Sequence, residues 1–163
     1  MDDGGPGLTL ARYDGLDAEE IRRRTGARRV ELRASVGSAL DVAHELAAAG
    51  APHGVLVLAE EQTAGRGRQG RSWQSPAGAG VWVVALLRPG TPPSAGALAI
   101  RVGLRLVEAV AEVAPRAAPR LKWPNDLIVR HRKAGGVLWT GVSPHRCGKK
   151  WRGAFGTESR SSW

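Results

Sequence analysis

The sequence is poor in cysteine and in long apolar runs, and each shortage excludes a class of protein. Its single cysteine, Cys147, cannot form an intrachain disulfide or a metal site built from several cysteines. No stretch approaches the ~18 consecutive apolar residues of a membrane-spanning helix. The first residues, Met1 to Gly5, are acidic and lack the basic and apolar segments of a secretory signal. We therefore expect a cytoplasmic protein with no membrane partner.

The positive charge is unevenly distributed along a chain whose 163 residues suit one domain. Of the formal net charge of +9, residues 1–140 carry +5 and residues 141–163 carry +4. Arginine supplies 20 of the 24 basic residues, in keeping with a general richness in Ala, Gly and Arg. The charge is thus only a weak indication of nucleic-acid binding. A basic nucleic-acid-binding module remains as an alternative from a different functional class.

Apolar residues at helical and strand spacing alternate along the chain and predict an α+β or α/β domain. We expect helices over residues 17–24, 38–50 and 96–113, and strands over residues 29–33, 55–59, 81–87, 121–123 and 126–129. Ser38, followed three residues later by Asp41, resembles a capping box at the start of the second helix. The third helix has a broad apolar face, so we expect it to be mostly buried.

A long polar segment from Glu60 to Gly80 separates two of the expected strands. Its glycines at 65, 67 and 70 match G-x-G-x-x-G, the fingerprint of a dinucleotide-binding turn. That fingerprint requires a strand immediately before the first glycine and a helix opening at the last one. Several polar residues precede Gly65 here, and Arg-Ser-Trp-Gln-Ser-Pro follows Gly70, so the context is wrong. No G-x-x-x-x-G-K-[ST] occurs either, which excludes a P-loop.

Three arginines, Arg66, Arg68 and Arg71, alternate with these glycines. Such a segment can wrap an anionic ligand by combining backbone N–H donors with bidentate guanidinium contacts. An intermediate that joins a carboxylate to a phosphate would suit it. A solvated loop or an RNA contact of the Arg/Gly type would have the same composition.

Three motifs in one order carry a resemblance to a known family. Residues 65–73, Gly-Arg-Gly-Arg-Gln-Gly-Arg-Ser-Trp, resemble the biotin loop of biotin protein ligases. Residues 122–126 resemble the K-W-P-N-D motif of that family, and residues 132–138 resemble its R-K-x-x-G-[IV]-L. Residues 36–41 take the place of its S-T-[NM] element. The resemblance covers roughly residues 29–138 and identifies the catalytic domain of a biotin protein ligase, in the biotin/lipoate ligase superfamily.

The resemblance implies a fold and a reaction. The fold is α+β: a mixed, largely antiparallel sheet with helices packed on it, of the class II synthetase-like type. The reaction is that of a biotin–[biotin carboxyl-carrier protein] ligase. ATP and Mg²⁺ convert biotin to biotinyl-5′-AMP, and the ε-amine of a lysine in a carrier domain then attacks the activated carbonyl. A lipoate or octanoate ligase is the alternative within the superfamily, although the Arg/Gly loop favours biotin.

The resemblance also assigns roles to residues. The biotin-binding set is Ser38, Ala39, Gln62, Arg66, Gly67, Arg68 and Lys133, of which Arg66, Arg68 and Lys133 are also catalytic. The ATP-binding set is Trp73, Lys122, Asn125 and Asp126, and no side chain is assigned as a metal ligand. Plain alternatives are a helix cap for Ser38, core packing for Trp73 and a turn for Asn125 and Asp126. Ala39 stands where the family has Thr, so we expect weaker binding of biotin.

The sequence departs from the family pattern after Leu138. The family continues into a glycine-rich G-x-G-x-N-V strand, whereas residues 139–163 are basic, rich in Trp and without an apolar period. We therefore expect an N-terminal extension with a short helix over 1–28, a partial catalytic domain over 29–138 and an aberrant tail over 139–163. On this interpretation the fold is truncated at its C-terminus, and an inactive remnant is a further alternative. No DNA-binding domain is expected, so repression is not implied.

Overall fold

A computed structural model describes residues 8–90 and 95–141. Its first layer is a three-stranded sheet in the order β1-β2-β3, formed by β1 (Arg29–Val36), β2 (Val55–Gln62) and β3 (Trp82–Leu86). β1 runs parallel to β2, and β3 runs antiparallel to it. The central strand is the most buried of the three, because it has a neighbour on each side and helices above and below.

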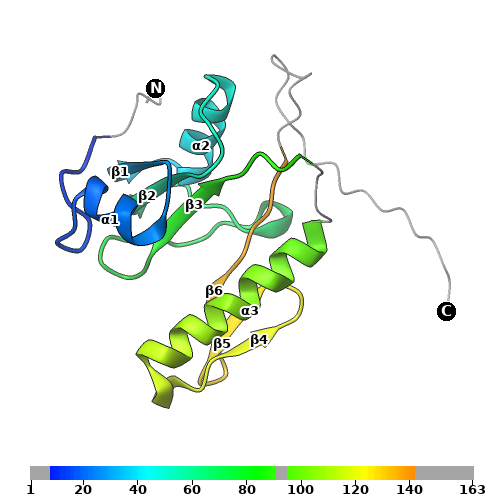
Figure 1. The fold of residues 1–163 in the computed structure, drawn as a ribbon. Coiled ribbons are helices and arrows are strands. Elements are labelled where there is room, and N and C mark those ends of the chain that lie inside the picture. Colours follow the sequence, from blue (N-terminus) through cyan, green and yellow to red (C-terminus); the bar gives the residue numbers. More distant parts are fainter. Residues whose placement is uncertain (1–7, 91–94, 142–163) are drawn as a thin grey trace, which may run out of the picture.

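Two helices, α1 (Ala18–Thr25) and α2 (Ala39–Ala48), pack on this sheet through two separate apolar clusters (Figure 1). The α2 cluster consists of Val36, Ala39, Ala43, Val57 and Ala59. The α1 cluster consists of Ile21, Leu32 and Leu58. Because side chains alternate along a strand, Val57 and Leu58 point to opposite faces of β2 and enter different clusters. The sheet is therefore covered on both faces.

Capping residues set the limits of the first helix. The Asp17 carboxylate accepts a hydrogen bond from the Glu20 backbone N–H at 2.8 Å, and Gly26 ends α1 in the left-handed conformation at φ 70°. Glycine adopts that conformation without the steric cost that a Cβ would add. Acidic residues in the first turn and basic residues in the last also suit the helix dipole. The predicted helix at this position is confirmed.

The second layer consists of α3 (Ala95–Val113) and an antiparallel sheet in the order β4-β5-β6. Its strands are β4 (Arg120–Lys122), β5 (Asp126–Val129) and β6 (Arg132–Gly136). Figure 1 shows α3 lying along these strands, below the first sheet. The described residues thus hold a mixed sheet and an antiparallel sheet with helices packed on them. The predicted α+β class is confirmed, with the strands divided between two sheets.

The expectation that the long third helix is mostly buried is wrong. Leu104 of α3 is 48% exposed and Val113 is 83% exposed. The helix meets the second sheet along a narrow line at Gly103, where an added Cβ would lie 2.7 Å from the Leu121 Cδ1 atom. Of the strands of that sheet, β4 and β5 contact the helix, and both are short. Much of its broad apolar face is therefore open to solvent in the described structure.

The strand predicted over residues 81–87 exists as β3, but it is not buried on both faces. Val83 is 51% exposed, while its neighbours Trp82 and Val84 pack against the α2 cluster. The strand lies at the edge of the first sheet and has one face covered, so its side chains alternate in burial. A purely apolar run could not distinguish this arrangement from a fully buried strand.

The division at residues 28 and 138 stays a prediction. The described part of the first segment packs on the sheet, since Leu10 donates a backbone hydrogen bond to Leu32 and Ile21 joins the core. Most of the tail predicted over 139–163, from residue 142 onward, lies outside the described residues. No helix within 8–90 and 95–141 is long and apolar enough to cross a membrane.

Candidate active site

The Arg/Gly segment forms a closed loop at the end of β2. Gln62 and Ser75 pair at its base, where the Gln62 N–H donates to the Ser75 carbonyl at 2.9 Å. Further along, the Trp73 N–H donates to the Gly65 carbonyl at 2.8 Å, and the Gly67 N–H donates to Arg71 at 2.7 Å. The backbone therefore turns back on itself like a hairpin. A single 3-10 turn, η1 (Arg68–Gly70), lies at its tip, where a dinucleotide-binding fold would open a helix.

Gly65 is required by a close approach of the two sides of this loop. A Cβ at that position would lie 2.4 Å from the Trp73 carbonyl oxygen and 2.9 Å from the Ser75 Oγ atom. Both distances are shorter than any real Cβ contact. The Trp73 carbonyl belongs to the backbone, so it could yield only if the loop itself moved. Glycine at this position therefore holds the base of the loop closed.

Gln62, predicted to bind biotin, has its side-chain amide held on both sides. Its Oε1 atom accepts from the Ala39 N–H at 2.9 Å, and its Nε2 atom donates to the Ser75 Oγ atom at 2.9 Å. Ala39 itself is 1% exposed, and it starts α2 beside the end of β2. The structure therefore brings together two predicted biotin residues through a direct hydrogen bond.

Ser38 caps α2, as the plain alternative for that residue expected. Its Oγ atom accepts from the Leu40 N–H at 3.3 Å, and the residue is 3% exposed. The predicted capping box is wrong in its second half, because the Asp41 carboxylate pairs with the Arg66 guanidinium. The Asp41 side chain thus faces the loop, across a gap of 25 residues in sequence.

The three predicted catalytic cations each have a polar partner on another element. Arg66 pairs with Asp41 of α2. The Arg68 Nη1 atom donates to the Asn125 Oδ1 atom at 2.8 Å, and the Lys133 Nζ atom lies 2.7 Å from the Asp126 Oδ1 atom. These contacts join the loop to the α2 start on one side and link the loop to the K-W-P-N-D hairpin on the other. The carboxylates of Asp41 and Asp126 thus partly neutralise the charges of Arg66 and Lys133.

Asn125 is the most constrained of the predicted nucleotide residues. It is 8% exposed, and its Nδ2 atom donates to the Val137 carbonyl at 3.0 Å while its Oδ1 atom accepts from Arg68. The Val137 N–H in turn donates to the Asn125 carbonyl at 2.9 Å. Residues 123–125 form a turn between β4 and β5, as the plain alternative predicted, and the Asn125 amide also contacts the loop. Lys122 lies opposite Asp126 in the register of the second sheet.

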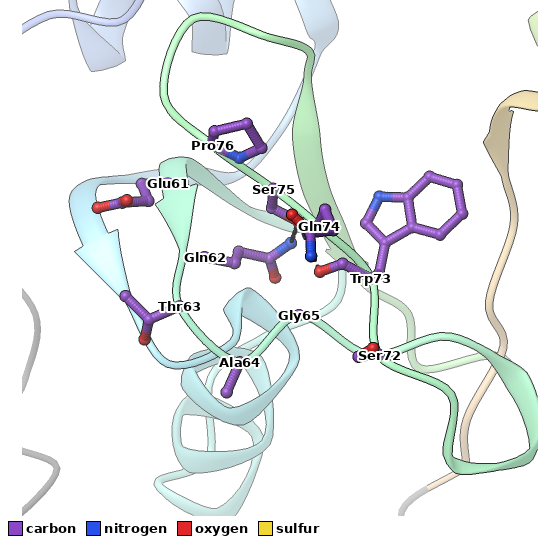
Figure 2. A pocket seen from close by; sticks show the side chains of 10 residues that line it. All are labelled: Glu61, Gln62, Thr63, Ala64, Gly65, Ser72, Trp73, Gln74, Ser75 and Pro76. Carbon is purple, nitrogen blue, oxygen red and sulfur yellow. Dashed lines mark hydrogen bonds between the residues drawn. The ribbon is translucent and has the colours of Figure 1, made fainter.

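Trp73 sits between the loop and the second sheet. The Lys133 Nζ atom lies over its ring at 5.1 Å from the centroid, close enough for a cation–π contact. Figure 2 shows the indole turned outward from the hollow, on the far side of the chain from Gln62. Core packing, the plain alternative for this tryptophan, does not describe it, since its ring contacts a half-exposed lysine.

A shallow hollow of about 250 Å³ lies at the base of the loop. It is lined by Glu61, Gln62, Thr63, Ala64, Gly65, Ser72, Trp73, Gln74, Ser75 and Pro76 (Figure 2). Gln62 thus contributes to the hollow, whereas the loop arginines and Lys133 lie outside its lining. The predicted site is therefore in two parts: a neutral part at Gln62, and a charged part made of Arg66, Arg68 and Lys133 with their partners on α2 and the second sheet.

His44 lies one turn after Asp41 on α2 and is close enough to the charged part to be influenced by it. Burial lowers the pKa of this imidazole below its ordinary value of 6.5, Asp41 raises the pKa and Arg66 lowers it. Its Nε2 atom is buried and has no hydrogen-bond partner within the described structure. A neutral histidine at neutral pH fits these surroundings.

Sequence reasoning missed two residues that shape this site, Asp41 and Ser75. The sequence pattern gives Asp41 the role of a cap, and nothing in it distinguishes Ser75 from the other loop residues. A hairpin interpretation of the loop would have paired Ser75 with Gln62, because the chain must return beside β2 to reach β3. Within the described residues, no group of three or more His, Cys, Asp or Glu side chains could hold a metal ion.

Comparisons with known proteins agree with the three motifs. Residues 38–148 match the model of the biotin/lipoate A/B protein ligase family. The bifunctional ligase/repressor BirA of Bacillus subtilis is 40% identical over 104 residues, which are 63% of this chain and 32% of that protein. The biotin–[acetyl-CoA-carboxylase] ligase of Mycobacterium tuberculosis is 38% identical over 123 residues, 73% of this chain and 42% of that protein.

A solved structure agrees with these relatives. The biotin protein ligase of Aquifex aeolicus in complex with biotin and ATP superposes with a TM-score of 0.56 at 30% identity, covering 65% of this chain and 44% of that one. The chain thus spans less than half the length of each of these three proteins. The family model covers more than half of this chain. By motifs, fold and family model alike, the chain belongs to the biotin/lipoate A/B protein ligase family.

Proposed function

We propose that this chain activates biotin with ATP and passes it to a lysine of a biotin carboxyl-carrier domain. One observation supports the proposal most: Arg68 of the biotin loop donates to Asn125 of the K-W-P-N-D motif, 57 residues away. The contact brings a motif expected to hold biotin against one expected to hold the nucleotide. Adjoining sites are what a reaction between two bound substrates requires, because it gains its rate from proximity and orientation.

The first step joins biotin to AMP. The biotin carboxylate attacks the α-phosphorus of ATP, a C–O–P linkage forms and the bond to pyrophosphate breaks. Negative charge gathers around the phosphorus during this attack. Arg66, Arg68 and Lys133 would neutralise it, and cations held in position do so without the reorganisation that water would need. Trp73, Lys122, Asn125 and Asp126 would position the nucleotide.

The second step transfers biotin to the carrier. The ε-amine of the acceptor lysine attacks the activated carbonyl, an amide bond forms, AMP leaves and the amine loses a proton. The M. tuberculosis relative is named for acetyl-CoA carboxylase, which supports a biotin carboxyl-carrier domain as the partner of this chain as well. Ser38, Ala39, Gln62 and Gly67 would hold the biotin end during both steps.

Binding of substrates would require the cations to change partners. Arg66 and Lys133 are paired with the carboxylates of Asp41 and Asp126, with side chains 46% and 44% exposed. Ion pairs of this exposure contribute only about 0–1 kcal/mol. A bound phosphate, with higher charge and several acceptor oxygens, can therefore displace them at little cost.

Mg²⁺ belongs to the proposal through the nucleotide. Mg²⁺ at nucleotide sites is commonly held by one or two carboxylates together with the phosphates of the substrate. Asp126, whose side chain is 24% exposed, is the carboxylate in the ATP-binding set and could supply one such oxygen. No step is assigned to the ion beyond partial neutralisation of the phosphates.

Ala39 would lower the affinity for biotin compared with the threonine that is usual at this position in the family. Its backbone N–H is used by Gln62, and its methyl group is buried. A missing neutral hydrogen bond costs on the order of 1 kcal/mol. We therefore expect a raised KM for biotin, with adenylate formation still followed by transfer to the carrier lysine.

Release of pyrophosphate by the 163-residue chain tests this function. We expect release only when biotin, ATP and Mg²⁺ are all present, and a slower first turnover of release in Arg68→Gly. Arg105→Ala is the matched control, since that arginine pairs with Glu108 on the exposed side of α3. Equal release with lipoate or octanoate would reject biotin as the substrate. No release with any of these acids would support an inactive remnant.

A further inference from the structure

We propose that Ser75 is a positioning residue that fixes the side-chain amide of Gln62 and so determines selectivity for the polar head group of biotin. The effect on biotin selectivity rests on the proposed function, whereas the hydrogen bond between Ser75 and Gln62 does not. Ser75 lies outside all three family motifs and is 2% exposed. Its hydroxyl lies 2.9 Å from the Gln62 Nε2 atom (Figure 2).

The orientation of the Gln62 amide follows from its two neighbours. The Ala39 backbone N–H can only donate, so the Gln62 oxygen must face it, at 2.9 Å. The amide nitrogen is then left facing Ser75, whose hydroxyl accepts from it and donates its own hydrogen toward the Trp73 carbonyl at 3.5 Å. Exchange of the amide oxygen and nitrogen would place two donors together at Ala39.

Ser75 is itself held in place by the backbone. Its carbonyl accepts from the Gln62 N–H at 2.9 Å, and the position of Gly65 leaves room for its hydroxyl, since a Cβ there would lie 2.9 Å away. The side chain of Ser75 therefore stays close to its present position unless the base of the loop opens. A rigid neighbour of this kind orients the glutamine without contacting the substrate.

The consequence is a defined pattern of hydrogen bonding at the neutral part of the site. With one N–H given to Ser75 and one lone pair given to Ala39, Gln62 retains one donor and one acceptor. The ureido ring of biotin also offers N–H donors and a carbonyl acceptor. An octanoyl chain offers neither, so it gains nothing from the orientation of the amide. Sites that hydrogen-bond a polar group discriminate strongly against analogues that lack it.

Kinetics of Ser75→Ala provide the first test. We expect the KM for biotin to rise about three- to tenfold, as loss of one neutral hydrogen bond predicts, with little change in kcat or in the KM for ATP. Thr25→Val is the control, because it removes a hydroxyl that makes two partly buried hydrogen bonds at the end of α1, outside the lining of the hollow. The control should lower thermal stability and leave the KM for biotin unchanged.

A double-mutant cycle separates positioning from a general structural effect. If Ser75 acts through Gln62, adding Ser75→Ala to Gln62→Ala should not raise the KM for biotin further. Independent, additive increases would overturn the proposal. Should Ser75→Ala fail to fold, Ser75→Cys keeps the volume but accepts hydrogen bonds weakly, and it should give a smaller rise in the same constant.

Hydrogen exchange of the Gln62 side-chain NH₂, followed by NMR in the ligand-free 163-residue chain, tests the contact without catalysis. We expect slow exchange in the wild type and fast exchange in Ser75→Ala. If the wild type releases no pyrophosphate but shows this difference, the proposed function fails and the positioning role stands. If the wild type is active and neither the exchange nor the KM for biotin responds to Ser75→Ala, the positioning role is overturned and the function stands.

Discussion

The two parts of the site differ in how their polar groups are satisfied. At the neutral part, Gln62 lies between the Ala39 N–H and the buried hydroxyl of Ser75. At the charged part, Arg66 and Lys133 are paired with carboxylates, but their side chains are 46% and 44% exposed. At the neutral part the partners of Gln62 are already in position. At the charged part a phosphate can replace the carboxylate partners of the cations at small cost.

This difference corresponds to the two kinds of group that the proposed substrates present. A neutral head group gives little energy per hydrogen bond, so a partner that is oriented in advance is needed to hold it. A phosphate binds cations strongly enough to displace exposed ion pairs, so cations that are paired with carboxylates beforehand can still bind it. A substitution in one part therefore leaves the other part as a reference.

The largest effect is expected from Arg68→Gly in the charged part. The adenylate should dissociate about ten- to a hundredfold faster, because a charge-assisted contact is worth roughly 1.5–3 kcal/mol. Biotin capture should change less, since the phosphate is present only after ATP joins. The measurement is the off-rate of preformed biotinyl-adenylate. Arg71→Gly removes the same charge from the same loop and is the control; equal losses from both would contradict a special role for Arg68.

Gly65→Ala should disturb the neutral part of the site. The added methyl group would meet the Trp73 carbonyl at 2.4 Å, so the base of the loop must open. We expect a loss of about 1–3 kcal/mol in the free energy of unfolding, as overpacking usually costs, together with a raised KM for biotin. Gly37→Ala is the matched control, because nothing lies within 4 Å of the added group. Equal thermal midpoints for the two variants would show that the loop base tolerates opening.

Asp41→Asn should free Arg66 of the charged part from its carboxylate partner, without a change at the neutral part. The pair is exposed, so the free energy of unfolding should change by less than about 1 kcal/mol. Because the substrates no longer compete with this carboxylate, the apparent KM for ATP should fall by up to about fivefold, the equivalent of such a pair. Glu108→Gln breaks a pair on α3 and should alter neither quantity. A raised KM would mean that Asp41 orients Arg66 for binding.

The smallest effect concerns pH and His44. Burial holds the pKa of this imidazole below its ordinary value of 6.5, so the native state binds a proton less readily than the unfolded chain. Stability should therefore fall as the pH decreases through about 6.5, since the unfolded state gains the proton first. His44→Gln should remove that part of the pH dependence between pH 7 and 5. Thermal unfolding of both proteins over this range is the measurement; identical slopes would contradict it.

Local chemistry explains why some elements were predicted well. The first helix begins at an aspartate cap and ends at a glycine in the left-handed conformation, and both signals are contained in a few adjacent residues. The strand at 55–59 is an uninterrupted apolar run and extends as β2 to Gln62. The three family motifs likewise occupy short stretches and identified the family from residue types alone.

Burial of α3 could not be predicted in this way. Its apolar face is read correctly from spacing, but whether that face is covered depends on what lies beside it. In the described structure β4 and β5 contact it, with Leu121 of β4 against Gly103, and Leu104 stays 48% exposed. The exposure of one face of β3 could not be predicted either, because its position at the edge of the sheet depends on the order of the strands.

The sequence by itself determined the family, the α+β class and the residue types at the site, because motifs and caps are properties of neighbouring residues. Only the tertiary structure decided which of those residues meet. Asp41 reaches Arg66 and Arg68 reaches Asn125 across 25 and 57 positions. Gln62 finds Ser75 because the chain returns beside β2. The two longer contacts depend on how the whole backbone closes, which no local pattern encodes.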